Sequence, residues 1–166
     1  MTLRQLSVLC LLCSPAAAQF YNISTIAGNG RQQFGAGGQA TSASLVQPRY
    51  VAVDSAGNFY VSDGYFEQVF RVTPAGVITA YAGNGTQGFS GDGAQATAAQ
   101  LFQPEGLAVD SSGNLYIADS GNYRIRMVTP AGAISTVALI GTGVIAVAVD
   151  GSGNLYVCLL YTSRCV

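Results

Sequence analysis

The sequence predicts an all-β fold made of a repeated four-stranded unit, and two observations lead to this prediction. The first is an internal period of 56 residues, by which Pro48 recurs as Pro104 and Asp63 recurs as Asp119. The second is a succession of short apolar runs separated by turns rich in Gly, Asn and Pro, which is typical of short antiparallel strands. Several short strands in each unit of a fixed period indicate the blades of a β-propeller.

The second unit contains four such runs, at 104–110, 115–119, 123–129 and 133–137. The residues between them, among them Pro130 and Gly132, are types that favour tight turns. The first two runs are almost continuously apolar, as expected for inner strands that pack on neighbouring blades on both faces. The third run alternates Arg124 and Arg126 with apolar residues, so we expect one of its faces to meet water.

Three stretches of this unit resemble the NHL repeat. They are Leu-Ala-Val-Asp110, Gly-Asn114-Leu-Tyr-Ile-Ala-Asp119 and Gly-Asn122-Tyr-Arg124-Ile. Residues 82–97 in turn resemble the long connector between blades of exported bacterial proteins in this family. The resemblance covers residues 23–157 and implies a propeller that mostly has six blades. The family includes sensor ectodomains, adhesive scaffolds, partner-binding domains and a few lyases.

The repeat pattern divides the propeller region into blades. We expect two full blades, at about 23–82 and 83–138, and part of a third at 139–157. A propeller closes with about 4–8 blades. This chain is therefore expected to form the N-terminal part of a larger, six-bladed domain.

The two ends of the chain are expected to lie outside the propeller region, which covers 19–157. Residues 1–18 have the features of a secretory signal peptide, with Arg4, an apolar core, and small residues before Gln19. They predict export to the periplasm or to the outside of the cell. Residues 158–166 begin with a hexapeptide that resembles a translated sequencing adapter, and we interpret them as read-through. A natural apolar strand is the alternative.

Composition argues against several classes of function. The chain has no His, carries a formal net charge of −1, and only 9% of its residues are charged. Nucleic-acid binding needs a basic surface, so no nucleic-acid partner is expected. The lack of His removes the commonest metal ligand and the commonest general base. We therefore predict no catalytic residue, no metal site and no cofactor, and no membrane span in the mature region.

Candidate binding residues lie in loops that should open on one face. Strand direction alternates within a blade, so the connector 83–104 and the turn 119–124 should lie side by side, and loops on a rigid scaffold often bind ligands. The candidates are Arg49, Phe89, Asp92, Glu105, Asp119, Asn122 and Arg124. For Asp119 and Arg124, an ion pair within the blade or a turn cap is favoured over ligand contact. For Phe89, packing of the connector onto the blade is favoured.

A second recurring motif is Asp-x-x-Gly-Asn. Its acidic and amide residues are Asp54 and Asn58, Asp110 and Asn114, and Asp150 and Asn154. A calcium loop would need several carboxylates, whereas each copy offers one. We expect these residues to form hairpin turns, in which the Asp side chain accepts backbone N–H groups.

These observations favour a non-catalytic, exported binding or scaffold module. Its partner would be a protein, a peptide or a glycan held on the connector side. Two alternatives stay open. One is a propeller lyase or hydrolase whose metal site lies in blades beyond this chain. The other is the sensor ectodomain of a membrane signalling protein.

Overall fold

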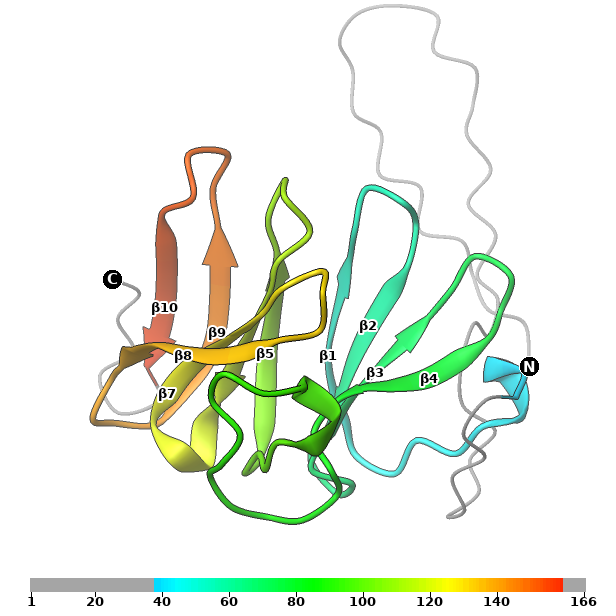
Figure 1. Ribbon diagram of the computed structural model, residues 1–166, viewed down its shortest axis with the longest axis horizontal. Helices are drawn as coiled ribbons and strands as arrows, with labels where there is room; N and C mark the ends of the chain where they lie inside the picture. The colour runs from blue at the N-terminus through cyan, green and yellow to red at the C-terminus, as the bar shows by residue number, and fades with distance from the viewer. Residues whose placement is uncertain (1–37, 160–166) are drawn as a thin grey trace, which may run out of the picture.

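The computed structural model describes residues 38–159, and within them the fold is all-β (Figure 1). The first sheet contains β1 (Pro48–Val53), β2 (Phe59–Asp63), β3 (Gln68–Val72) and β4 (Ile78–Ala82). The second contains β5 (Pro104–Val109), β6 (Leu115–Asp119), β7 (Arg124–Val128) and β8 (Ile134–Leu139). A hairpin follows, formed by β9 (Val144–Val149) and β10 (Leu155–Leu159). Three short 3-10 helices complete the described part, η1 (Ala40–Ser42), η2 (Ala96–Ala98) and η3 (Ser120–Asn122).

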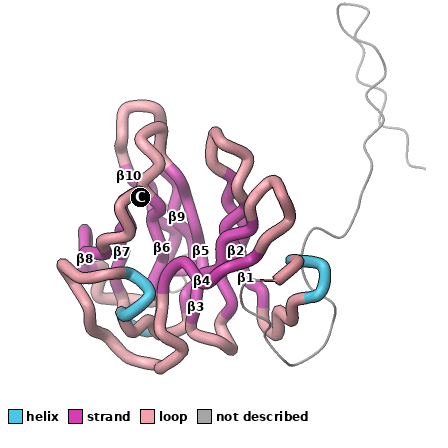
Figure 2. Tube along the Cα trace, turned by 45° about the vertical axis from the view of Figure 1, so that its right-hand side comes forward, coloured by secondary structure: helices cyan, strands magenta, loops and turns pink. Residues whose placement is uncertain are grey.

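Each sheet is an antiparallel meander whose strands follow the order of the chain. The first strands of the three units lie side by side, since β5 packs between β1 and β9. Figure 2 shows the three sheets fanning out from this inner row of strands. The predicted blade architecture of four short antiparallel strands is confirmed for both complete units.

Most predicted strands agree with the observed ones to within two residues. The fourth strand of the second unit is longer than expected and reaches Leu139. In the third unit, β10 also continues past the expected end, because Cys158 pairs with Ala146 and Leu159 pairs with Val144. The first two residues of the segment interpreted as read-through therefore extend a regular strand. The predicted signal peptide, and residues 160–166, lie outside the described residues.

The sheets are held together by apolar side chains between neighbouring blades. Between the first and second blades, Tyr60 and Val69 pack against Leu107, Leu115 and Ile117, all of them buried. Removing one such large side chain from water stabilises the fold by roughly 1.5–3 kcal/mol. A single sheet has no core of its own, so this packing between sheets supplies the core.

The second blade and the hairpin approach each other even more closely. A Cβ atom on Gly106 of β5 would lie only 2.5 Å from the Cα atom of Ala146 in β9. Glycine is therefore needed here for the two backbones to pack. Around this contact, Ile125, Val144 and Val147 are buried in a second apolar cluster.

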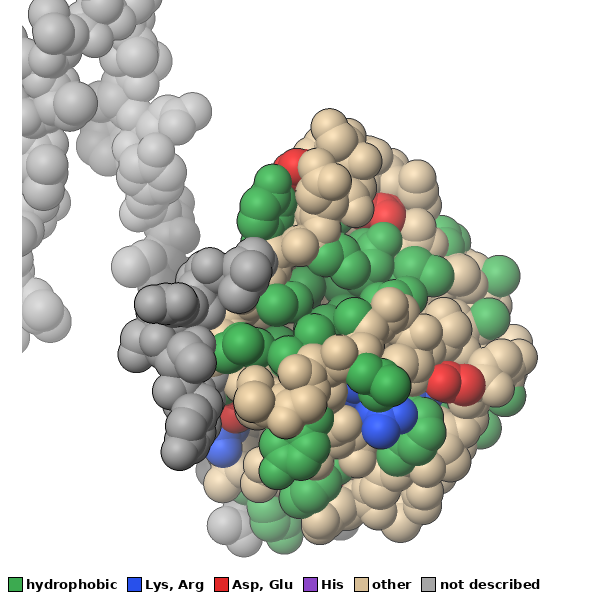
Figure 3. Space-filling model, turned by 90° about the vertical axis from the view of Figure 1, so that its left-hand side faces the viewer, with side chains coloured by type: hydrophobic (Ala, Val, Ile, Leu, Met, Phe, Trp, Pro, Cys, Tyr) green, Lys and Arg blue, Asp and Glu red, His purple; other side chains and the backbone are tan. Residues whose placement is uncertain are grey.

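The outer face of the hairpin is apolar and exposed. Figure 3 shows hydrophobic side chains gathered on the side of the molecule where β8 and β10 lie. Tyr156 of β10 is 49% exposed, and Leu139 at the end of β8 is 74% exposed. Within residues 38–159, no further sheet covers this face.

One expectation about the third strand is wrong. The alternation along β7 predicted that Arg126 would face water, yet its side chain is completely buried. The reason is the connector, residues 83–103, which folds back over the second blade. There the N–H of Gly93 donates to the carbonyl of Ile134, and the N–H of Ala96 donates to the carbonyl of Gly132. The connector thus covers the face of β7 that would otherwise meet water.

The Asp-x-x-Gly-Asn motifs form three equivalent hairpin turns. In the second, Asp110 Oδ1 accepts the N–H groups of Ser112 and Asn114, both at 2.9 Å. Its Oδ2 accepts Asn114 Nδ2 at 2.8 Å and the Tyr116 hydroxyl at 3.2 Å. The same contacts recur from Asp54 to Ala56, Asn58 and Tyr60 and from Asp150 to Ser152, Asn154 and Tyr156.

These contacts occupy both oxygens of each carboxylate. Burial opposes ionisation of Asp110, but hydrogen bonds from Asn114, Tyr116 and Ser112 outweigh it and hold the pKa of Asp110 below its ordinary value. The ionised form is therefore the one that the turn uses. Among residues 38–159 no group of three or more His, Cys, Asp or Glu side chains could hold a metal ion.

We predict that Asp110→Asn lowers the free energy of unfolding by about 1 kcal/mol near neutral pH, because an amide cannot accept all four hydrogen bonds. A carboxylate with a lowered folded-state pKa stabilises above the unfolded pKa of about 3.9, and its contribution is lost as pH falls through the folded value. Urea unfolding at pH 7 and in acid should show a smaller difference between variant and wild type at the lower pH. Ser111→Ala, in the same turn, is the control and should show little change at either pH. A difference that persists unchanged in acid would contradict the prediction.

Candidate functional site

The loops of the blades lie on two opposite faces of the described part. The connector face is formed by the β2–β3 and β6–β7 loops and by the connector, residues 83–103. The turn face is formed by the β1–β2, β5–β6 and β9–β10 turns, together with the β3–β4 and β7–β8 turns. In Figure 1 the connector is the green loop at the bottom, and the hairpin turns point to the top.

Asp119, a binding candidate for which the sequence favours an ion pair within the blade or a turn cap, is completely buried. Its Oδ1 accepts the N–H of Phe102 at 2.8 Å, and its Oδ2 accepts Asn122 Nδ2 at 2.8 Å. Burial raises the pKa of Asp119, although these donors and the guanidinium of Arg126 act in the opposite direction. Asp119 thus joins the end of the connector to the β6–β7 loop and is unavailable to a ligand.

Asp63 has the same role in the first blade. Its carboxylate accepts the N–H of Val46 at 2.7 Å and the N–H of Tyr65 at 2.9 Å. In both blades, a buried carboxylate at the end of the second strand therefore fixes the chain that enters the first strand. This recurrence supports a structural role for both residues.

The partner of Asp119 is Arg126, and this arginine also holds the connector. Arg126 Nη1 lies 3.5 Å from Asp119 Oδ2 and donates to the carbonyl of Gln100 at 3.3 Å. Its Nη2 donates to the carbonyl of Ser90 at 3.0 Å and to Asp92 Oδ1 at 2.8 Å. Asp92, predicted as a binding candidate, therefore forms an ion pair while its side chain remains 39% exposed.

Sequence reasoning placed Arg126 on a water-facing side and missed this ion pair. A signal was present, because Phe70 occupies the position of Arg126 in the first unit, 56 residues earlier. The first connector also has no counterpart of Asp92. The two charges thus occur in the same unit and are both absent from the other, as expected of interacting partners.

Phe89 and Arg124 stack on each other at the connector face. The Cζ atom of Arg124 lies 3.6 Å from the centroid of the Phe89 ring, and Arg124 Nε donates to the carbonyl of Asn122 at 2.9 Å. Asn122 Nδ2 also donates to the carbonyl of Gly88 at 2.8 Å. Phe89 therefore anchors the connector, yet its side chain is still 42% exposed.

The other two predicted binding residues do not join this group. Arg49 is exposed near the start of β1, where its side chain lies against Gly64. Glu105 is half-buried in β5, and its carbonyl accepts the hydroxyl of Ser62 at 2.7 Å. The structure thus brings together Phe89, Asp92, Asp119, Asn122 and Arg124 and leaves Arg49 and Glu105 apart.

Two exposed tyrosines on the connector face were not predicted. Tyr65 in the β2–β3 loop is 61% exposed, and Tyr123 in the β6–β7 loop is 52% exposed. Tyr123 adopts a left-handed conformation with φ of 55°. A bulky residue rarely adopts this conformation. The sequence motif alone does not show which way either ring points.

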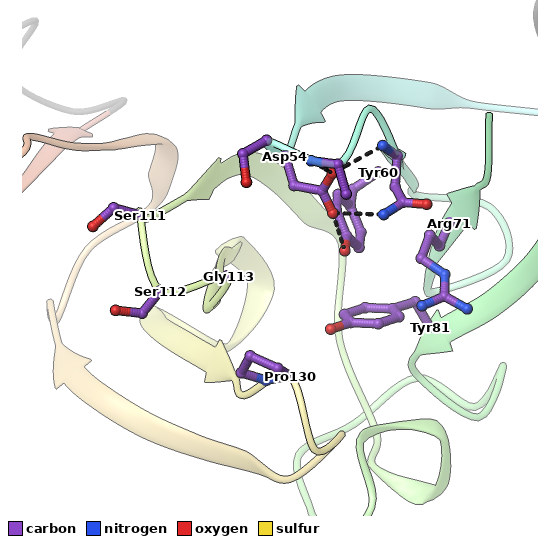
Figure 4. Close-up of a pocket in the computed structure, with 11 residues that line it drawn as sticks. Asp54, Tyr60, Arg71, Tyr81, Ser111, Ser112, Gly113 and Pro130 are labelled. Carbon is purple, nitrogen blue, oxygen red and sulfur yellow. Dashed lines mark hydrogen bonds between the residues drawn. The ribbon is translucent and has the colours of Figure 1, made fainter.

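A cleft of about 320 Å³ lies on the turn face, between the first and second blades (Figure 4). Tyr60, Arg71 and Tyr81 line it from the first blade. Residues 111–113 and Pro130 line it from the second blade. Sequence reasoning did not identify this cleft, because it lies between two turns that are 56 residues apart in the sequence.

The described residues contain no helix long and apolar enough to cross a membrane.

Comparison with known proteins agrees with this architecture. The family described as the Teneurin NHL domain matches residues 85–148. Teneurin-1 of Mus musculus is 34% identical over 103 residues, which cover 54% of this chain and 4% of that protein. A Bacteroides thetaiotaomicron structural genomics protein of unknown function superposes with a TM-score of 0.64 at 27% identity. This match covers 76% of this chain and 36% of that one.

A likeness to virginiamycin B lyase from Staphylococcus aureus concerns the fold alone. The TM-score is 0.52 at 14% identity, with 76% of this chain and 41% of that chain covered. The sheets, their order and these comparisons define the described units as β-propeller blades. Their repeats are similar to those of the NHL type, and the family match covers residues 85–148.

We predict that Arg126→Met lowers the free energy of unfolding by about 3 kcal/mol, because it leaves Asp119 as a buried carboxylate without its cationic partner. Urea unfolding monitored by circular dichroism measures the change. Arg124→Met on the same strand is the matched control and should cost less than about 1 kcal/mol, since Arg124 is only half-buried. Equal losses in the two variants would show that the buried ion pair has no special role.

Proposed function

We propose that these blades form a non-catalytic binding or scaffold module that holds a protein or peptide partner on the connector face, outside the cytoplasm. The observation that carries the proposal is the stacked pair of the exposed Phe89 and the half-buried Arg124, in which the guanidinium lies 3.6 Å from the ring centroid. NHL-type propeller domains commonly bind partners or act as scaffolds, which supports this class of function. The identity of the partner and the location of the protein belong to the proposal.

The pair has the properties of an interface hot spot. Arginine and large aromatic residues are enriched among the residues that contribute most to binding between proteins. Stacking on Phe89 and the hydrogen bond from Nε to Asn122 fix the Arg124 side chain before any partner arrives. Less side-chain entropy is then lost when a partner binds.

The guanidinium also has donors left for a partner. Among residues 38–159 the terminal nitrogens of Arg124 form no hydrogen bond. A carboxylate of a partner could accept two parallel hydrogen bonds from such a group. Tyr65 and Tyr123, more than half exposed on the same face, add apolar area to it. We therefore propose a partner that presents an acidic residue flanked by apolar ones.

The proposed location rests on residues 1–18, which have the pattern of a secretory signal peptide. We predict that a secreting host cleaves the chain before Gln19, and intact mass spectrometry of the exported product tests this. Ala18→Arg should block cleavage, because the site requires small residues. Recovery of exported protein that still carries Met1 would contradict the prediction.

Binding on the connector face can be tested with a displayed peptide library selected on the full chain. We expect enriched peptides to contain Asp or Glu, and their affinity to fall at least about 10-fold in Arg124→Ala, a loss of about 1.4 kcal/mol. Phe89→Ala should have a similar effect, because it removes the support of the guanidinium. Val53→Ala, at the turn end of β1, is the control and should leave affinity unchanged. Peptides that bind equally well to both connector-face variants would disprove the proposed site.

A further inference from the structure

We propose that the cleft on the turn face, between the first and second blades, binds a small hydroxylated carboxylate such as an acidic sugar. This site lies on the face opposite to the proposed partner-binding surface and is independent of it. Its volume of about 320 Å³ is at the lower end of the range of about 300–1,000 Å³ found for ligand pockets. The size suits a ligand of one or two sugar rings.

Two of the residues that line the cleft, Arg71 and Tyr81, are not repeated in the second blade. Arg71 pairs with Tyr60 across the strands of the first blade, and Met127 pairs with Tyr116 at the same place in the second. Tyr81 is likewise replaced by Val137, 56 residues later.

At the interface of the second blade with the hairpin, Met127 packs with the apolar cluster. The framework of the turn, with its Asp, Asn and Tyr, is the same in all three units. If Arg71 and Tyr81 served only to support this turn, the same residues would be expected in the other units. Arg71 and Tyr81 are therefore better explained by a role at the first interface alone.

Arg71 supplies a positive charge at the cleft. Its guanidinium lies 5.6 Å from the centroid of the Tyr81 ring, and its buried Nε atom has no hydrogen-bond partner in the described part of the chain. Among residues 38–159 it also forms no ion pair. A buried donor left without a partner is costly, so such groups call for explanation. A ligand carboxylate would supply the missing acceptor.

The aromatic residues and hydroxyls of the cleft suit a ligand with hydroxyl groups. Tyr60 and Tyr81 meet edge to face with ring centroids 4.9 Å apart. Tyr81 is the extra residue at a β-bulge, since Val69 pairs with Ala82 while the next residue, Phe70, pairs with Ala80. Bulges often re-aim a side chain next to a functional site. In Figure 4 the Tyr81 hydroxyl points toward the loop that carries Ser111 and Ser112.

The titratable groups around the cleft are compatible with an anionic ligand. Burial raises the pKa of Tyr81, so its phenol keeps its proton and can donate a hydrogen bond. Asp54 is the one carboxylate lining the cleft, and its oxygens accept hydrogen bonds from Ala56, Asn58 and Tyr60. Because Asp54 repels a second carboxylate, the acidic group of the ligand should lie against Arg71 and the hydroxyls should face Asp54.

The test is titration of the full chain with D-galacturonate. Binding is monitored by the shifts of protein resonances in NMR spectra. Neutral D-galactose and acetate are titrated in parallel, to separate the contributions of the ring and of the charge. The variants are Arg71→Met and Tyr81→Val, which place the residues of the second blade into the first. Arg49→Met removes an exposed arginine from the connector face and is the matched control. Circular dichroism verifies that each variant is folded.

We expect galacturonate to bind more tightly than either galactose or acetate. Its affinity should fall at least 10-fold in Arg71→Met, fall to a smaller extent in Tyr81→Val, and stay unchanged in Arg49→Met. No saturable binding by wild type would overturn the proposal. Equal affinity for galactose, or equal affinity of Arg71→Met and wild type, would also overturn it.

Discussion

Each sheet within residues 38–159 is a single layer of strands, so the buried side chains on its faces must be covered by something else. Neighbouring blades cover each other through Tyr60 and Val69 on one side and Leu107 and Ile117 on the other. The inner strands approach so closely that Gly106 leaves no room for a Cβ atom beside Ala146. Stability is therefore a property of pairs of blades rather than of one blade, as in other repeat architectures.

The connector covers the outer part of the second blade, and charged side chains hold it there. Arg126 is buried under the connector and binds Asp119 below it and Asp92 above it. In the first blade the equivalent position is Phe70, which packs beneath Ala40 and Ala43. The same backbone arrangement therefore holds an apolar contact in the first blade and an ion pair in the second. In the second blade, the ion pair of Arg126 and Asp92 fixes the connector that carries Phe89. The geometry of the connector face follows from this buried arginine.

The two faces use arginine in different ways. On the connector face, Arg124 is half-buried and stacked on the exposed ring of Phe89, which suits contact with a partner surface. On the turn face, Arg71 is recessed beside Tyr60 and Tyr81 in a concave cleft, which suits a small ligand. Neither arginine is repeated in the other blade, since Gln68 stands at the position of Arg124 and Met127 at that of Arg71. A repeated framework with changes at a few positions is how one scaffold can carry different binding sites.

The sequence by itself determined the blade architecture, the strand order and the hairpin turns, because these depend on local turn chemistry and on a period that is visible in the residues. It also indicated that the connector and the β6–β7 loop share a face. Only the tertiary structure decided that Arg126 and Asp119 are buried, that Tyr65 and Tyr123 are exposed, and that Arg71 and Tyr81 meet residues 111–113 across a cleft. These outcomes depend on contacts between segments that are tens of residues apart. Alternation along a strand reports which side chains share a face, but it does not report what covers that face.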